Sequence, residues 1–147
     1  MATFKRFEEM HARQSVRDLV RLVYEITKQP DFNHDYALRD QIRRAVISVM
    51  SNIAEGFEIG SDAEFVRFLG YARRSVSETQ SQLYAALDQN YITSETFDEI
   101  YTKANITERQ INALIGFLVH TKHGKIIKED TTPYFIKLPD DLDWSDL

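Results

Sequence analysis

The chain has 147 residues, of which 43% are hydrophobic and 28% are charged, and these values are typical of a soluble globular protein with one domain. It contains no cysteine, which excludes disulfide bonds and thiolate metal sites. The net charge of −5 excludes a strong overall attraction to nucleic acid, although it leaves local basic patches open.

Two helices are predicted in the first part of the chain. Apolar residues recur at steps of three and four over residues 4–26, and Pro30 closes this block. A second block with the same spacing covers residues 38–57, which places its apolar side chains on one helix face. We expect a connection of about ten residues between the two helices.

Two further helices are predicted after residue 60. The third begins at Ser61, which can form a capping box with Glu64. It ends at Asn90, a residue type that tolerates the left-handed conformation of a helix terminus. The fourth begins near Ser94, a good N-cap, and ends at Gly124.

Short connections between long helices force neighbouring helices to run antiparallel. The sequence therefore predicts an all-α fold, an antiparallel up-down-up-down four-helix bundle over residues 1–124. Residues 125–147 are predicted to be an irregular C-terminal extension, rich in aromatic and acidic residues. We expect this extension to dock on the bundle or on a neighbouring subunit, because aromatic side chains bury large areas in a groove. A peptide that binds a protein partner is the alternative.

The second predicted helix carries the most distinctive motif of the chain, which consists of Gln41-Ile42-Arg43-Arg44-Ala45, Ser48 and Ser51-Asn52-Ile53-Ala54-Glu55-Gly56. This motif resembles the signature of a bacterial four-helix bundle family whose founding members are encoded in intervening sequences of large-subunit ribosomal RNA genes. The resemblance covers roughly residues 7–122. It implies a homopentamer. A related branch is the accessory variability determinant of diversity-generating retroelements, which binds a reverse transcriptase and nucleic acid.

A polar stripe lies beside the apolar face of the second helix and consists of Ser48, Ser51, Asn52 and Glu55. These residues are three, four and seven positions apart, so they share one face. One interpretation is contact with a ligand or RNA. The other, which we favour, is hydrogen bonding between helices or subunits, because polar networks often specify how a bundle packs.

Six arginines of the second and third helices could form a basic band: Arg39, Arg43, Arg44, Arg67, Arg73 and Arg74. Repeated around a ring, such a band would contact the phosphates of RNA or DNA. The alternative is ion pairing, because Asp40 precedes Arg44 by four residues and Glu78 follows Arg74 by four. The absence of a lysine excess favours ion pairing at a subunit interface.

No catalytic residue, cofactor or metal site is predicted. His120 and His123 have the spacing of a weak metal clamp, but no acidic third ligand lies beside them at helical spacing. The simpler interpretation is that both histidines are exposed at the C-terminal end of a helix, where their positive charge interacts favourably with the helix dipole. The sequence contains no glycine-rich phosphate loop, zinc-protease motif or nucleophile elbow.

The sequence and the resemblance together predict a non-enzymatic, homopentameric scaffold or adaptor. The competing hypothesis is an RNA- or DNA-binding accessory protein of the ribosomal RNA intervening-sequence or reverse-transcriptase type, which would use the arginine band. We expect a soluble, cytoplasmic protein without a membrane partner, because no apolar run reaches the roughly 20 residues that span a bilayer. The first residues also lack the apolar core of a signal peptide.

Overall fold

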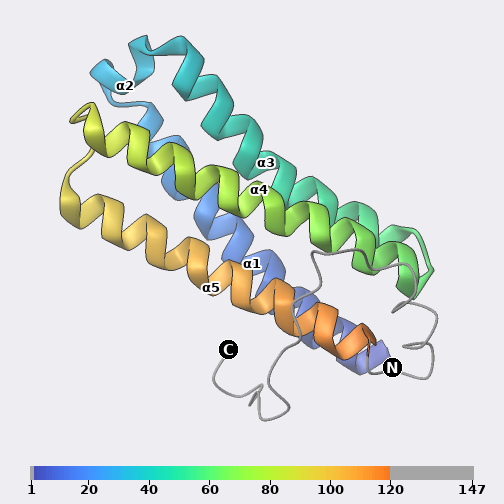
Figure 1. Cartoon of the computed structure of the whole chain (residues 1–147). Helices are drawn as coiled ribbons and strands as arrows, with labels where there is room; N and C mark the ends of the chain where they lie inside the picture. The colour runs from blue at the N-terminus through green and yellow to red at the C-terminus, as the bar shows by residue number, and fades with distance from the viewer. Residues whose placement is uncertain (1, 120–147) are drawn as a thin grey trace.

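A computed structural model describes the backbone of residues 2–119 and the side chains of residues 11–119. The regular structure of this part is helical throughout and consists of α1 (Ala2–Thr27), α2 (Pro30–His34), α3 (Tyr36–Glu58), α4 (Asp62–Asp88) and α5 (Ser94–Val119) (Figure 1). The predicted helix end at Gly124, the extension over residues 125–147, and both His120 and His123 lie outside the described residues.

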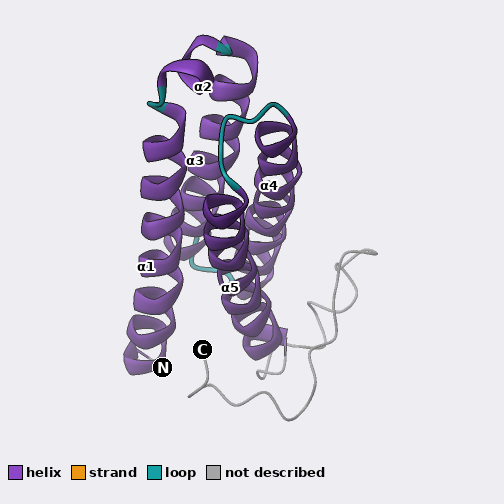
Figure 2. Cartoon of the chain, turned by 90° about the vertical axis from the view of Figure 1, so that its left-hand side faces the viewer, coloured by secondary structure: helices purple, strands orange, loops and turns teal. Residues whose placement is uncertain are grey.

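The four long helices form one antiparallel bundle. Around the bundle axis, α1 packs against α3, α3 against α4, α4 against α5, and α5 against α1. The two views in Figures 1 and 2 show the same arrangement. The α1–α3 and α4–α5 connections lie at one end of the bundle, and the α3–α4 connection lies at the other end. The predicted up-down-up-down bundle is therefore confirmed for the described residues.

The connection between the first two long helices differs from the prediction, because it contains the short helix α2. Pro30 occupies the start of α2, where a missing N–H costs no hydrogen bond. Phe32 is fully buried and stacks on the ring of Tyr91, with ring centroids 5.1 Å apart. The Tyr91 hydroxyl donates to Asp35 Oδ2 at 3.0 Å, and Asp35 Oδ1 accepts from the Leu38 N–H at 3.1 Å to cap α3. This cluster closes one end of the bundle.

The other turns follow the sequence signals in part. Ser61 caps α4 by accepting from the Glu64 N–H at 3.5 Å, as predicted. The reciprocal bond from the glutamate side chain is absent within the described residues, because Glu64 pairs instead with Arg67 at 3.4 Å. Asn90 has φ 59°, so it does adopt the left-handed conformation.

The core is apolar and contains fully buried side chains from all four long helices, such as Leu19, Ile42, Leu69 and Ile100. The helices α3 and α4 approach closely at Gly56. A Cβ atom there would lie 3.2 Å from the Cβ of Phe68. Among the described helices, none has the length and apolar character needed to cross a lipid bilayer.

Candidate functional site

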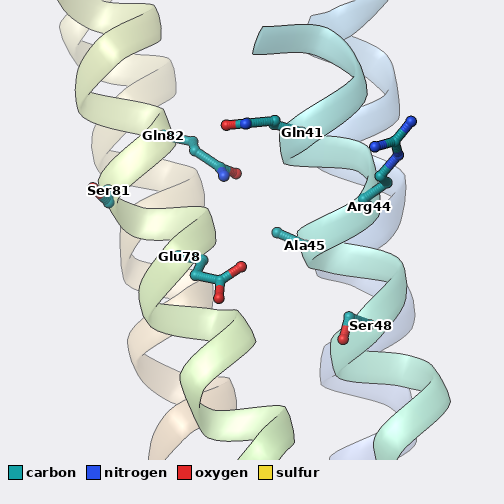
Figure 3. A pocket seen from close by; sticks show the side chains of 7 residues that line it. All are labelled: Gln41, Arg44, Ala45, Ser48, Glu78, Ser81 and Gln82. Atoms are coloured by element: carbon teal, nitrogen blue, oxygen red, sulfur yellow. The ribbon is translucent and has the colours of Figure 1, made fainter. Parts of the chain in front are cut away.

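An open cleft of about 630 Å³ lies between α3 and α4 on the outer surface of the bundle. Figure 3 shows its walls from close by. The lining side chains are mostly polar or charged, and they are Gln41, Arg44, Ala45 and Ser48 from α3 and Glu78, Ser81 and Gln82 from α4. We call the surface around this cleft the α3–α4 face.

The predicted polar stripe forms one edge of the α3–α4 face. Asn52 Nδ2 donates to the carbonyl oxygen of Ser48 at 2.8 Å and to Ser48 Oγ at 3.0 Å. Ser75 Oγ of α4 also donates to Ser48 Oγ, at 3.0 Å. Ser48 therefore joins the stripe to the neighbouring helix within the chain. Ser51 and Glu55 are exposed and lie beyond this network.

Several polar groups on the α3–α4 face have no partner among residues 11–119. The Oε1 atom of Gln82 is buried and accepts no hydrogen bond there. Glu78 and Gln82 point toward α3 in Figure 3. The exposed charges of Glu78, Glu55 and Arg44 form no ion pair in this part of the chain.

Two of the arginines on α3 are held by residues of the same bundle on the side away from α4. Arg39 donates to the carbonyl oxygen and to Oδ1 of Asn33, both at 3.1 Å, and pairs with Asp40 at 2.9 Å. Arg43 Nε donates to Thr27 Oγ1 at 2.8 Å, and its guanidinium lies 4.7 Å from the centre of the Tyr24 ring. Arg39 and Arg43 thus tie α3 to α1 and to the segment around α2.

The three arginines on α4 lie in different surroundings. Arg73 is only 8% exposed, and its Nη1 donates to Asn112 Oδ1 at 3.4 Å. Burial lowers the pKa of the Arg73 guanidinium below its ordinary value, although the charge of Glu108 opposes this shift. Arg67 pairs with Glu64, and the guanidinium of Arg74 lies 5.0 Å from the centre of the Tyr71 ring.

The structure therefore does not bring the six arginines together as one band. Arg44, Arg67 and Arg74 lie on the outer surface of α3 and α4, whereas the others turn toward α1, α2 or α5. The predicted pairs are also different. Asp40 pairs with Arg39 instead of Arg44. Glu78 forms no ion pair with Arg74 in the described part.

Sequence reasoning missed the α4 wall of the cleft. Glu78, Ser81 and Gln82 lie three and four positions apart, so they share one helix face, and this spacing was a signal that could have been used. Gln41 completes the wall on α3. Over the described residues, no three carboxylate or imidazole groups come close enough together to hold a metal ion.

Comparisons with known proteins agree with this fold. The sequence model of the family described as 23S rRNA-intervening sequence protein matches residues 8–113. The chain is also similar to a solved structure from Bacteroides thetaiotaomicron, a protein with unknown function from the S23 ribosomal protein family. The two share 23% sequence identity with a TM-score of 0.65, over 71% of this chain and 97% of that chain. This likeness shows the fold. No curated protein matches the chain significantly.

Proposed function

The chain belongs to the 23S rRNA-intervening sequence protein family, and from this premise we propose that it is a non-enzymatic scaffold or adaptor assembled from identical bundles. The proposed assembly is a homopentamer in which the α3–α4 face of each chain contacts the next chain. The assembly would hold partner molecules in a fixed arrangement. The α3–α4 face would act as the contact surface between chains.

The observation that carries this proposal is a pair of exposed charges in the cleft, Arg44 and Glu78, which form no ion pair with any residue of 11–119. Gln41, Ser81 and Gln82 add further polar side chains to the lining of the same cleft. A second copy with charges and hydrogen-bonding groups in complementary positions would pair these exposed groups.

The hydrogen bonds of Ser48 support the same function. They fix the spacing of α3 and α4 along the cleft, since Ser48 Oγ accepts from both Asn52 and Ser75. A surface held at fixed spacing presents its side chains without a large loss of conformational entropy on binding. The α3–α4 face is thus preorganised for contact with one partner geometry.

Static light scattering on the purified chain at micromolar concentration tests the proposal. We expect a particle of five times the chain mass of 17.2 kDa. Replacing Glu78→Arg should weaken the assembly, because the change adds a second cation beside Arg44. The matched control is Asp98→Arg, which makes the same change at an exposed position of α5. A monomeric wild-type chain would rule the proposal out.

Contact with nucleic acid is the second candidate function. It is favoured by Arg44, Arg67 and Arg74, which share the outer surface of α3 and α4, with the Tyr71 ring beneath the guanidinium of Arg74. Each such arginine adds a salt-sensitive phosphate contact. Filter binding with structured RNA tests this function.

In that experiment, replacing all three arginines by alanine should abolish binding, whereas the control Arg109→Ala on α5 should retain it. No binding by the wild-type chain at low salt removes this candidate and leaves the scaffold proposal in place.

A further inference from the structure

A ring of identical chains needs two different contact surfaces on each chain, because rotation brings one surface of a copy against another surface of the next. The α3–α4 face is the first surface. Within residues 11–119 it presents the exposed carboxylates of Glu55 and Glu78, which form no ion pair. It also presents Arg44 as a cation without an anion. The second surface must therefore carry mostly donors, with an anion opposite Arg44.

A row of exposed charges on α1 has this composition. Its members lie three or four positions apart, so they share the outer side of the helix, and they are Arg17, Arg21, Glu25 and Lys28. Arg21 makes only a long contact with Asp18, at 3.7 Å, and its side chain is 60% exposed. The other three have no side-chain partner in the described part of the chain. We call these residues the α1 row.

The height of a residue is its position along the bundle axis. Contacts inside one bundle give the heights of the α1 row relative to α3. Arg43 of α3 binds Thr27 and stacks on Tyr24, so these residues lie at one level along the bundle axis. Both helices rise by about 1.5 Å per residue and run antiparallel. Counting from this contact, Glu25 lies level with Arg44. The same count places Arg17 within about one turn of Glu55.

The heights of α4 follow in the same way. The hydrogen bond from Ser75 to Ser48 sets the level of these two helices. Glu78 lies three residues after Ser75, so it is level with Ala45, which lies three residues before Ser48 on the antiparallel helix. By the same count, Gln82 is level with Gln41. Because Gln41 precedes Arg43 by two residues, Gln82 also lies near the level of the C-terminal end of α1, where Lys28 follows.

We propose that the α1 row of one copy docks on the α3–α4 face of the next copy, by rotation about an axis parallel to the bundle. Such a rotation keeps every residue at its own height, so residues level within one chain meet across the interface. Arg17 then lies within about one turn of Glu55, Glu25 lies level with Arg44, and Lys28 lies level with the exposed Gln41 side chain. Arg21 and Glu25 both lie within about one turn of Glu78. This inference rests on the assembly proposed above and assigns its contacts.

The mixed signs of both surfaces favour a second copy over a nucleic acid as the occupant. Glu55 and Glu78 on the α3–α4 face would repel a phosphate backbone, and so would Glu25 within the α1 row. Charges of both signs instead favour one register between two protein surfaces, because a shift of the α1 row by one turn brings Lys28 or Arg21 level with Arg44.

Charge reversal across the proposed contact tests the inference. The full chain is prepared as Glu25→Arg, as Arg44→Glu, and with both changes together, and the assembly of each is measured by sedimentation velocity over a dilution series. Each single change should weaken assembly at least about tenfold, because it places like charges together at every junction. The combined variant should return to within about threefold of wild type. At about 1 M salt the differences should shrink, since the Debye length falls to about 3 Å.

Asp98→Arg and Arg109→Glu on the outer side of α5 are the matched controls, and both should assemble as wild type does. A second exchange, Arg17→Glu with Glu55→Arg, repeats the test should either first variant fail to fold. Single variants that assemble normally would overturn this docking mode, as would a combined variant no better than the single ones. A monomeric wild-type chain would overturn the proposed function itself, whereas a wild-type ring insensitive to both exchanges would overturn only this inference.

Discussion

Ser75 of α4 donates a hydrogen bond to Ser48 of α3, with 3.0 Å between the two hydroxyl oxygens. Ser75 is buried, at 7% exposure, so its hydroxyl cannot exchange this bond freely for water. The bond also sets the relative height of the two helices that line the cleft. It therefore links the stability of the bundle to the geometry of its candidate site.

Replacing Ser48→Ala should lower the free energy of unfolding by about 1–2 kcal/mol, because the Ser75 hydroxyl and the Asn52 amide both lose a partner. Urea unfolding followed by circular dichroism measures this change. The double variant with Ser75→Ala should cost less than the sum of the two single changes, since the second removes a hydroxyl that the first has already left unpaired. Strictly additive losses would show that the two serines are not coupled.

The two glycines in the interiors of α3 and α4 should respond to alanine in opposite directions. Gly56→Ala should destabilise the bundle by about 1–3 kcal/mol, because the new methyl group would press on the Cβ of Phe68, which is fixed to the α4 backbone. Gly70 has open space around its Cα, so Gly70→Ala should stabilise the chain by about 0.5–1 kcal/mol through helix propensity.

Urea midpoints of the two glycine variants, measured under identical conditions, check this contrast. Equal effects of the two changes would contradict the close approach of α3 and α4 at Gly56.

Arg73 should prove to be a structural residue. Its guanidinium is buried against α5 and donates to Asn112, so Arg73→Ala should lower the free energy of unfolding by about 1.5–3 kcal/mol. Arg67 makes an exposed pair with Glu64, and Arg67→Ala should cost no more than about 1 kcal/mol. Thermal unfolding of the two variants side by side distinguishes these roles, and a loss at Arg67 as large as that at Arg73 would be inconsistent with this assignment.

Alkaline pH should destabilise the end of the bundle closed by α2. The Tyr91 hydroxyl donates to Asp35, and this bond, with burial as a second cause, raises the pKa of Tyr91 above its ordinary value of 10.0. A raised pKa means that the folded state holds the phenol proton more tightly than the unfolded state does. The stabilisation is therefore fully present below about pH 10 and is lost as the pH rises through the higher folded pKa.

Tyr91→Phe should remove part of this loss, which urea unfolding at a series of alkaline pH values measures. Some pH dependence of the free energy of unfolding should remain in this variant, because the pKa of Tyr101 is raised as well, mainly by Tyr84. Tyr36→Phe is the control, since Tyr36 is 61% exposed. An unchanged pH dependence in Tyr91→Phe would show that the bond to Asp35 does not set the stability of this end.

The sequence was sufficient to predict the bundle, because apolar periodicity identifies the long helices and the residues Ser61 and Asn90 mark the two ends of α4. Packing in the folded bundle does not change these helices. It was not sufficient for α2, whose single turn is fixed by the burial of Phe32 against Tyr91, a residue 59 positions later in the chain. Helical spacing contains no information on such a distant contact.

The candidate site was predictable only on its α3 side. The stripe from Ser48 to Glu55 is visible as a spacing pattern, whereas its connection to α4 depends on which face α4 turns inward. The arginines show the same limit. Arg43 and Arg44 are adjacent in sequence, yet one binds Thr27 of α1 and the other lines the cleft toward α4. A helix turns by about 100° per residue, so neighbours in sequence face different helices.

In the proposed assembly, the α3–α4 face joins identical chains into a closed ring. Native mass spectrometry of the wild-type chain at micromolar concentration tests this claim most directly, because it counts the chains in each particle. We expect particles of five chains, each of 17.2 kDa. Particles of a single chain at that concentration would contradict it.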